Sequence, residues 1–473
     1  MTPLDPILEI IIAAIVTTFG AGAIAPANYR AGAAVVVAGT VAGLIASIQL
    51  IAMTFLPPYI HTVIGIGGLT FAINKLTALF TLTTFIIGFA AALYAVDIVP
   101  KRTPAALPPF LSLFIFSIAL LGLSADPIAA CIFVELQAMS IIFILLAGEE
   151  YASEAGVKYL YMTLLGTIVE LSGLGLLMIY GSTFVLGLAL FTVGLFLKVG
   201  LFPFHAWLPD VHARAHTSAS AVLSSVAVAS GMVAVMNLVE PMIGSVATLT
   251  MFGYCLLALS VASAAYGSLC AVTQPDVKRA LAFSTIGHMG FAGIPFSLAM
   301  IIPSAKWPLL SISMLYLIVH ALGKSLLFLA GGLPVALYGL HEYTHLGGLF
   351  RKHKVATWTF LGGALTLSGL PPLPGFFAKL FVLYSLAYAT VALHSWLMGG
   401  LLAFILGVAI VTPAYAIRRL WHRTFLGQEK TYPETPTTYL ANAACIILML
   451  ALLILGTLPA FALAGQILVP PLR

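Results

Sequence analysis

Several ionisable side chains lie inside long apolar runs of this sequence, where a charge is costly. Glu135 lies within AACIFVELQAMSIIFILL, and Lys198 lies within LALFTVGLFLKVGLF. On insertion scales, an unpaired charge at the centre of a membrane helix costs about 2.5–3.5 kcal/mol. Such groups therefore face protein or water, pair with one another, or spend part of their time neutral. A lysine that alternates between paired and unpaired states can carry protons, and these residues indicate that chemistry.

Five more residues extend this set. They are Glu170, His288, His320, Lys324 and Lys379, each well inside its own apolar run. His320 precedes Lys324 by one helical turn, so the two share a helix face. Purely structural ion pairs are the alternative interpretation. They account less well for three lysines and two histidines that have only two acids between them.

A Glu135–Lys198 pair would be strong enough to act as a switch. At about 4 Å and an effective dielectric constant of about 20, its Coulomb energy is roughly 4 kcal/mol. Separating the pair would release the proton of the lysine, and a charge change in a neighbouring protein is an expected trigger.

The sequence predicts no metal, no cofactor and no redox centre in this chain. The four cysteines stand singly, without the CxxC spacing of iron–sulfur or zinc sites. No P-loop and no dinucleotide-binding GxGxxG is present. Three histidines in one loop lack a clean ligand spacing, and solvated or capping histidines are the favoured interpretation; they are His205, His212 and His216. Any redox chemistry coupled to this protein would take place in another chain.

The elements that position these residues are membrane-spanning helices. The chain is 61% hydrophobic and only 7% charged, whereas charged residues make up roughly a quarter of a soluble chain. Breaks divide it into about fourteen apolar spans, each near the length that crosses a bilayer. We predict an all-α polytopic membrane protein whose first apolar run is helix 1. The predicted centres are 15, 42, 84, 114, 137, 168, 194, 227, 258, 290, 321, 370, 405 and 452.

The seventh and twelfth spans carry helix-breaking prolines beside a lysine. Pro203 and Pro209 follow Lys198, while LSGLPPLPGFFAKLF places three prolines before Lys379. Proline removes a backbone donor, and a membrane tolerates the break only where protein or water satisfies the freed groups. Two broken helices five spans apart indicate two five-helix repeats of opposite orientation.

These repeats define four predicted segments. Residues 1–104 hold helices 1–3, residues 105–240 the first half-channel repeat (helices 4–8), residues 241–425 the second repeat (helices 9–13), and residues 426–473 helix 14. Most lysines and arginines fall in loops after odd-numbered helices, while the other side keeps only Lys75, Lys306 and Arg473. The positive-inside rule then predicts cytoplasmic basic loops and both termini outside, in the cell or inner membrane. This bias also explains the net charge of +5, so it indicates no nucleic-acid partner.

Six stretches in order along the chain resemble one family. They are FVELQAMS, EAGVKYLYMTLLG, LKVGLFPFHAWLPD, QPDVKRALAFSTIGHMG, VHALGKSLLFLAGG and LSGLPPLPGFFAK. Together they resemble the antiporter-like, proton-translocating membrane subunits of respiratory complex I, membrane-bound energy-converting hydrogenases and Mrp-type cation/proton antiporters. The resemblance covers more than half of the chain.

This resemblance implies fourteen helices, inverted repeats over helices 4–8 and 9–13, and a hydrated polar axis at mid-membrane. It makes Glu135 and Lys198 the switching pair. It also makes Lys324, flanked by His320, the central relay, and Lys379 the terminal lysine of the second half-channel. Lys158 lies in a matching stretch and is a secondary relay candidate.

Helix 8 departs from the family pattern. Many members carry a lysine or histidine there, whereas this sequence has Ser224, Ser225 and Ala229 in SASAVLSSVAVASG. Water held by Ser218, Ser224 and Ser225 is the expected substitute. Glu170 would compensate as a second acid near Lys198.

The sequence therefore predicts a proton-translocating, antiporter-like subunit of an energy-converting membrane complex, coupled to redox chemistry in other subunits. Expected partners are other membrane subunits, antiporter-like neighbours among them, and optionally a peripheral redox arm. Two alternatives stay open, a Mrp-type Na⁺/H⁺ antiporter subunit and a structural subunit with a vestigial channel. The sequence leaves open which complex it joins, which ion it moves and which electron donor is involved.

Overall fold

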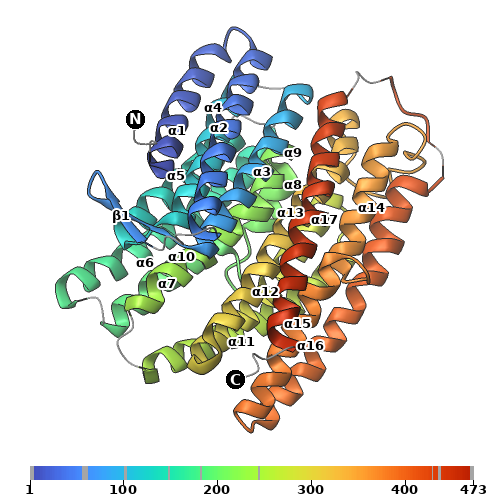
Figure 1. Ribbon diagram of the computed structural model, residues 1–473. Helices are drawn as coiled ribbons and strands as arrows, with labels where there is room; N and C mark the ends of the chain where they lie inside the picture. Colours follow the sequence, from blue (N-terminus) through green and yellow to red (C-terminus); the bar gives the residue numbers. More distant parts are fainter. Residues whose placement is uncertain are drawn as a thin grey trace. The chain divides into compact units, whose positions relative to one another are not determined.

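A computed structural model describes residues 5–55, 62–100, 104–146, 150–181, 184–242, 246–428, 430–434 and 438–468 (Figure 1). By its internal contacts the chain divides into two compact units. Unit 1 comprises Met1–Gly200, Asp210–Gly244 and Pro436–Ala444, and unit 2 comprises Leu201–Pro209, Ser245–Thr435 and Cys445–Arg473. Each unit is described by itself.

Unit 1 is helical apart from one β-hairpin. Its elements are α1 (Pro6–Ile24), α2 (Tyr29–Phe55), β1 (Thr62–Ile66), β2 (Leu69–Ile73), α3 (Lys75–Asp97), the short 3₁₀ turn η1 (Pro104–Ala106), α4 (Leu107–Leu123), α5 (Pro127–Leu146), α6 (Glu150–Tyr180), α7 (Val185–Val199), α9 (Thr217–Val222), the π-helical turn η2 (Leu223–Ala227) and α10 (Val228–Met242). Helix α8 (Leu208–Arg214) begins in unit 2 and continues in unit 1 from Asp210 onward.

Among its described residues, unit 2 has helices and no β-strand. They are α11 (Val246–Thr273), α12 (Val277–Ile301), the 3₁₀ turn η3 (Pro303–Ala305), α13 (Lys306–Tyr338), α14 (Lys354–Ser368), α15 (Pro374–Ala392), α16 (Trp396–Tyr415), the π-helical η4 (Ala416–Leu426) and most of α17 (Tyr439–Leu468), whose first turn belongs to unit 1.

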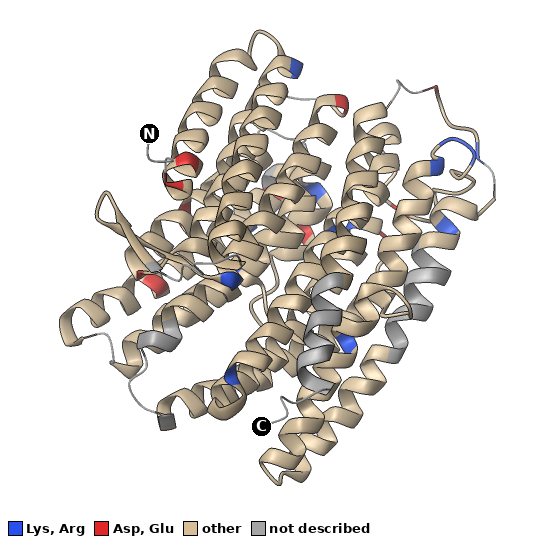
Figure 2. Cartoon of the chain, in the orientation of Figure 1, with Lys and Arg blue, Asp and Glu red and all other residues tan. Residues whose placement is uncertain are grey.

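The helical membrane architecture is confirmed. Twelve helices of the described chain are long and apolar enough to cross a membrane, and two shorter apolar helices, Val185–Val199 and Trp396–Ala409, accompany them. Few charged residues interrupt the helices (Figure 2). The count of fourteen spans stays a prediction.

The β-hairpin was not predicted. β1 and β2 pair antiparallel from Thr62↔Ile73 to Ile66↔Leu69, and Gly67 and Gly68 form the connecting turn with φ of 60° and 83°. Two successive positive φ angles are what a two-residue hairpin turn requires, and glycine adopts them without strain. A glycine pair between two short runs rich in β-branched residues was the signal available in the sequence.

The same order of helix neighbours recurs in both units. In unit 1, α4 packs on α5, α5 on α6, α6 on α7, α7 on α10, and α10 returns to α4. In unit 2, α11 packs on α12, α12 on α13, α13 on α14 and α15, both of these on α16, and α16 returns to α11. Counted with α14 and α15 as the two halves of one broken helix, both arrangements close over five members, which supports the predicted repeats. Their opposite orientation and the four segment boundaries stay predictions.

Both predicted helix breaks are confirmed. α7 ends at Val199, and Gly200 follows in the left-handed conformation with φ 75°. α14 ends at Ser368, and Gly369 follows with φ 80° before α15 begins at Pro374. A glycine in this conformation terminates a helix because it lacks the Cβ that makes left-handed backbone costly. The prolines then keep the chain from continuing the same helix.

Candidate functional site

In unit 1, Lys198 binds two carboxylates at once. Its Nζ forms an ion pair with Glu135 and lies 2.9 Å from Glu170 Oε2. The three side chains come from α5, α6 and the last turn of α7. The Glu170 side chain is 1% exposed and that of Lys198 is 8%, whereas Glu135 is 33% exposed. The structure thus places Glu170 beside Lys198 as a second acid, with Glu135 at the outer edge of the cluster.

Each acid also receives a hydrogen bond from the helix of the other. Thr167 on α6 donates from Oγ1 to Glu135 Oε1 at 2.6 Å. Cys131 on α5 donates from Sγ to Glu170 Oε1 at 3.2 Å. Sequence reasoning missed both donors. Their spacing was the signal, since Cys131 precedes Glu135 by one turn and Thr167 precedes Glu170 by three residues.

Glycines bring α6 and α7 close enough for this cluster to form. A Cβ on Gly194, one turn before Lys198, would lie 2.6 Å from the backbone nitrogen of Glu170. A Cβ on Gly166 would lie 3.3 Å from Lys198 Cε. Small residues at membrane helix interfaces allow backbones to approach closely. The position of Lys198 therefore depends on residues with no ionisable group.

In unit 2, Lys324 is fully buried with neutral partners. Its Nζ donates to Leu281 O at 2.9 Å and to the hydroxyl of Ser284, both on α12. Within the described chain no carboxylate lies within 4.0 Å of this nitrogen. The charge of Lys324 is therefore uncompensated nearby, in contrast to that of Lys198.

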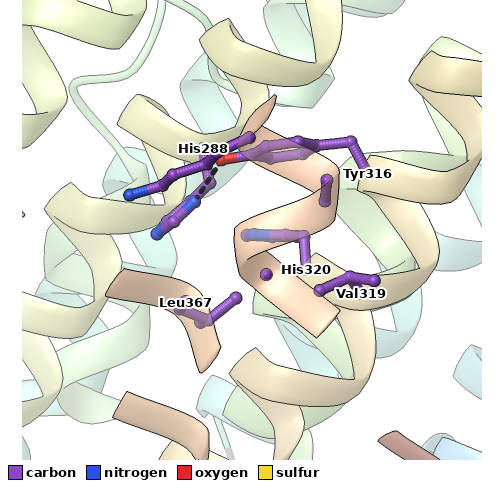
Figure 3. A pocket seen from close by; sticks show the side chains of 8 residues that line it. His288, Tyr316, Val319, His320 and Leu367 are labelled. Carbon is purple, nitrogen blue, oxygen red and sulfur yellow. Dashed lines mark hydrogen bonds between the residues drawn. The ribbon is translucent and has the colours of Figure 1, made fainter. Parts of the chain in front are cut away.

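His288, Tyr316 and His320 gather around one small cavity (Figure 3). The Tyr316 hydroxyl lies 2.8 Å from His288 Nδ1, and the two histidine rings are 5.4 Å apart between centroids. Tyr316, His320 and Lys324 follow one another at four-residue spacing, so they line one face of α13. The cavity includes Lys379 in its lining and has room for about one water molecule. Tyr316 was not predicted.

Lys379 satisfies the backbone at the second helix break. Its Nζ donates to Ser368 O, the last carbonyl of α14, at 3.0 Å, and lies 5.5 Å from the centroid of the Phe291 ring. A lysine that caps freed carbonyls is one way to make a broken helix tolerable in a membrane. The sequence placed Lys379 beside this break, and in the structure the lysine forms a hydrogen bond with the last residue before it.

Removing the Tyr316 hydroxyl should slow ion movement past His288, because the hydrogen bond between these two residues is lost. We expect Tyr316→Phe to lower ion flux roughly three- to tenfold, because a hydrogen bond contributes about 0.5–1.5 kcal/mol. The ring stack between Tyr316 and Phe291 should remain, so the protein should stay folded. Flux into vesicles checks this, with the exposed Tyr384→Phe as control. Equal flux in both variants would exclude a role for the hydroxyl.

The secondary candidates lie in different settings. Lys158 is half-exposed and pairs with Asp210 at 3.0 Å and Glu154 at 3.2 Å. Ser224 and Ser225 are fully buried in the π-helical turn η2, where Ser225 Oγ donates to Ala221 O at 2.6 Å. A π-turn within a helix frequently marks a functional site.

Histidines of the loops do not form a metal cluster. His216 caps α9 by accepting from Ser218 N, which confirms a capping role for this residue. His205 packs its ring on Tyr266 at 4.5 Å between centroids. Residues 341–345 spell HEYTH, a match to the HExxH zinc motif that the sequence analysis overlooked. They lie in a turn and not on a helix, and no group of metal-ligating side chains is found in the described ranges.

Comparison with known proteins shows the family of this chain. The family described as NADH:quinone oxidoreductase/Mrp antiporter, transmembrane, matches residues 124–406, more than half of the chain. The chain belongs to this family. The match covers the Lys198 cluster, the Lys324 site and Lys379. Antiporter-like membrane subunits are thus its relatives.

Two curated members illustrate the relation. Hydrogenase-4 component B of Escherichia coli is 26% identical over 89% of this chain and 66% of its own length. NADH-quinone oxidoreductase subunit N of Pelobacter propionicus is 30% identical over 68% of this chain and 67% of its own. The chain thus spans about two thirds of the length of both relatives.

Solved structures show the same fold. A chain of the Mrp complex from Dietzia sp. superimposes with a TM-score of 0.83 at 18% identity, covering 100% of this chain and 98% of the other. A chain of Thermus thermophilus respiratory complex I gives 0.74 at 23% identity, covering 97% and 98%. A chain of an archaeal membrane-bound sulfane sulfur reductase gives 0.83 at 20% identity, covering 97% of each. All three are chains of multi-subunit membrane complexes.

Proposed function

We propose that this chain translocates protons as an antiporter-like subunit of an energy-converting complex related to complex I or to membrane-bound hydrogenases. The observation that carries the proposal is Lys324, which is wholly buried and contacts only neutral groups. A lysine retained for structure alone would be expected to have a counter-ion, because an unpaired buried charge is costly. A lysine that alternately gains and loses a proton needs no permanent partner.

Protons would enter from the cytoplasmic side and leave outward. In this scheme Glu135 and Lys198 form the switch, Lys324 with His320 and His288 forms the central relay, and Lys379 is the exit residue. The basic loops would face the cytoplasm, with both termini outside. Ser224 and Ser225 would hold water in place of the family's helix-8 carrier.

Another membrane subunit would cover and trigger the switch. Glu135 is one-third exposed on the face of α5 that also exposes Ile132 and Met139. A carboxylate turned toward hydrocarbon is costly, so a neighbouring protein surface is the expected cover. A charge change in that neighbour, itself driven by a redox arm in another chain, would separate Glu135 from Lys198.

A Mrp-type Na⁺/H⁺ antiporter subunit is the second candidate. The description of the matching family names the Mrp antiporter beside NADH:quinone oxidoreductase, and this favours it. The two candidates differ in the coupled ion. Translocation that needs Na⁺ would select the second, and a redox protein that co-purifies in mild detergent would select the first.

Lys324→Ala in the intact complex tests the proposal. We expect proton flux to fall about tenfold or more while assembly is retained, since the central relay loses its lysine. The matched control is Lys354→Ala, an exposed lysine at the start of α14. Unchanged flux and coupling in Lys324→Ala would favour the vestigial-channel alternative instead.

A further inference from the structure

The Lys198 cluster carries more negative charge than its lysine compensates. Glu135 and Glu170 both contact the single ammonium of Lys198. If both acids were ionised, one negative charge would stay in excess among side chains that are mostly buried. Such a charge is costly at membrane depth, and two carboxyls that share one site do not readily ionise together.

We propose that Glu135 and Glu170 share one proton, so that whichever acid is ionised holds Lys198. Glu170 is then the resident counter-ion in the observed arrangement, and Glu135 is the acid that gains and loses the proton. The inference deepens the proposed function, on which it rests for the use made of this proton. No bond other than that to the moving proton is made or broken.

The hydrogen bonds distinguish the two acids. Both oxygens of Glu170 accept, Oε1 from Cys131 and Oε2 from Lys198, as expected of an ionised carboxylate. At Glu135, Thr167 and Lys198 both contact Oε1, and no hydrogen bond within the described chain reaches Oε2. Oε2 of the more exposed acid is therefore the place for the proton.

Thr167 can serve both protonation states of Glu135. Its hydroxyl lies 2.6 Å from Glu135 Oε1 and 2.8 Å from Thr163 O. When Glu135 is ionised, the hydroxyl donates to it. When Glu135 carries the proton on Oε2, its Oε1 is still an acceptor, so the hydroxyl can keep donating to Oε1 or turn to Thr163 O.

The groups that face the two acids are few. α5 contributes Cys131, α7 contributes Lys198, and α6 contributes Thr167 and the buried Tyr159. The ammonium of Lys198 is the one cation in contact with them among the described residues. Exchange of the proton between the acids thus leaves Lys198 paired in both states.

Infrared spectroscopy of the full-length protein in lipid tests the shared proton. The carbonyl band of a protonated carboxyl should be present near neutral pH and shift in D₂O. It should disappear in both Glu135→Gln and Glu170→Gln, because the remaining acid then ionises to pair with Lys198. It should roughly double in Lys198→Met, where neither acid has a cation. Exposed Glu154→Gln is the control and should keep the band.

Two results would overturn the inference. One is the absence of the band from the unmodified protein, which requires no mutation and so does not depend on folding. The other is retention of the band in either glutamine variant with the fold intact by thermal unfolding. Neither result bears on proton flux. Loss of flux in Lys324→Ala would still support the proposed function, and normal flux there would leave the shared proton standing.

Cys131 acts as a positioning residue for the resident acid. Removing its thiol in Cys131→Ala should raise the pH at which the band disappears by up to about half a unit, roughly threefold in proton affinity, because loss of a weak donor to ionised Glu170 allows the shared proton to rest on Glu170 as well. Cys131→Ser should restore the midpoint. A purely packing role for Cys131 would leave the midpoint unchanged in both variants, and that outcome would remove Cys131 from the mechanism.

Discussion

Alanine at Lys198 should reduce proton flux roughly a hundredfold or more. Among the described residues, the lysine is the one cation that contacts both acids, and an interaction of about 4 kcal/mol corresponds to almost three orders of magnitude. Without it, Glu135 and Glu170 would both be protonated, and neither would respond to a charge change in a neighbouring subunit. Flux into vesicles that hold the assembled complex is the measurement.

Lys158→Ala provides the contrast. Lys158 also pairs with acids, but its side chain is 51% exposed, and exposed pairs contribute about 0–1 kcal/mol. We expect its flux to stay within about threefold of normal. Equal losses in the two variants would mean that flux does not depend on the buried pairing of Lys198, and the buried switch would be refuted. A large loss of flux in Lys158→Ala alone would instead indicate that Lys158 is a main residue of the proton relay.

Gly375→Ala should destabilise the protein by about 3 kcal/mol, the upper end of typical overpacking effects. A Cβ at this position would lie 1.6 Å from the carbonyl oxygen of Thr366, which is backbone and cannot rotate away. Relief requires α15 to move away from α14 at the second break. Lys379 lies one turn beyond Gly375, so its bond to Ser368 O should be lost as well.

Thermal unfolding in detergent, together with proton flux, checks this expectation. Gly407→Ala is the matched control, because a Cβ there meets no atom within 4 Å and alanine favours a helix. Gly375→Ala with normal stability and flux would show that the two helix segments can separate freely. In that case the break would not fix the position of Lys379.

Some properties of this protein follow from the sequence alone, because their physical causes are local. Transfer of apolar side chains to lipid depends on composition, so the membrane class was predictable. The cost of a buried charge depends on the residue and its surrounding run, which selected Glu135, Lys198, Lys324 and Lys379. Proline chemistry is equally local, which is why both helix breaks were found.

Other properties depended on which helices are neighbours. Sequence spacing could not show that Lys198 pairs with both acids. Nor could it show that Lys324 donates only to a backbone carbonyl and a hydroxyl among the described residues. It also showed Cys131 only as one of four single cysteines, because a thiol becomes informative only when a carboxylate lies beside it. Tyr316 was hidden for the same reason.

Close contacts at glycines are a further property that the tertiary structure shows and the sequence does not. Gly194 and Gly375 look like ordinary small residues in apolar runs, yet each lies where two backbones nearly touch. Residue type sets which groups can carry charge, and this can be read from the sequence. The distances that decide whether those groups pair are set by helix packing, which only the tertiary structure defines.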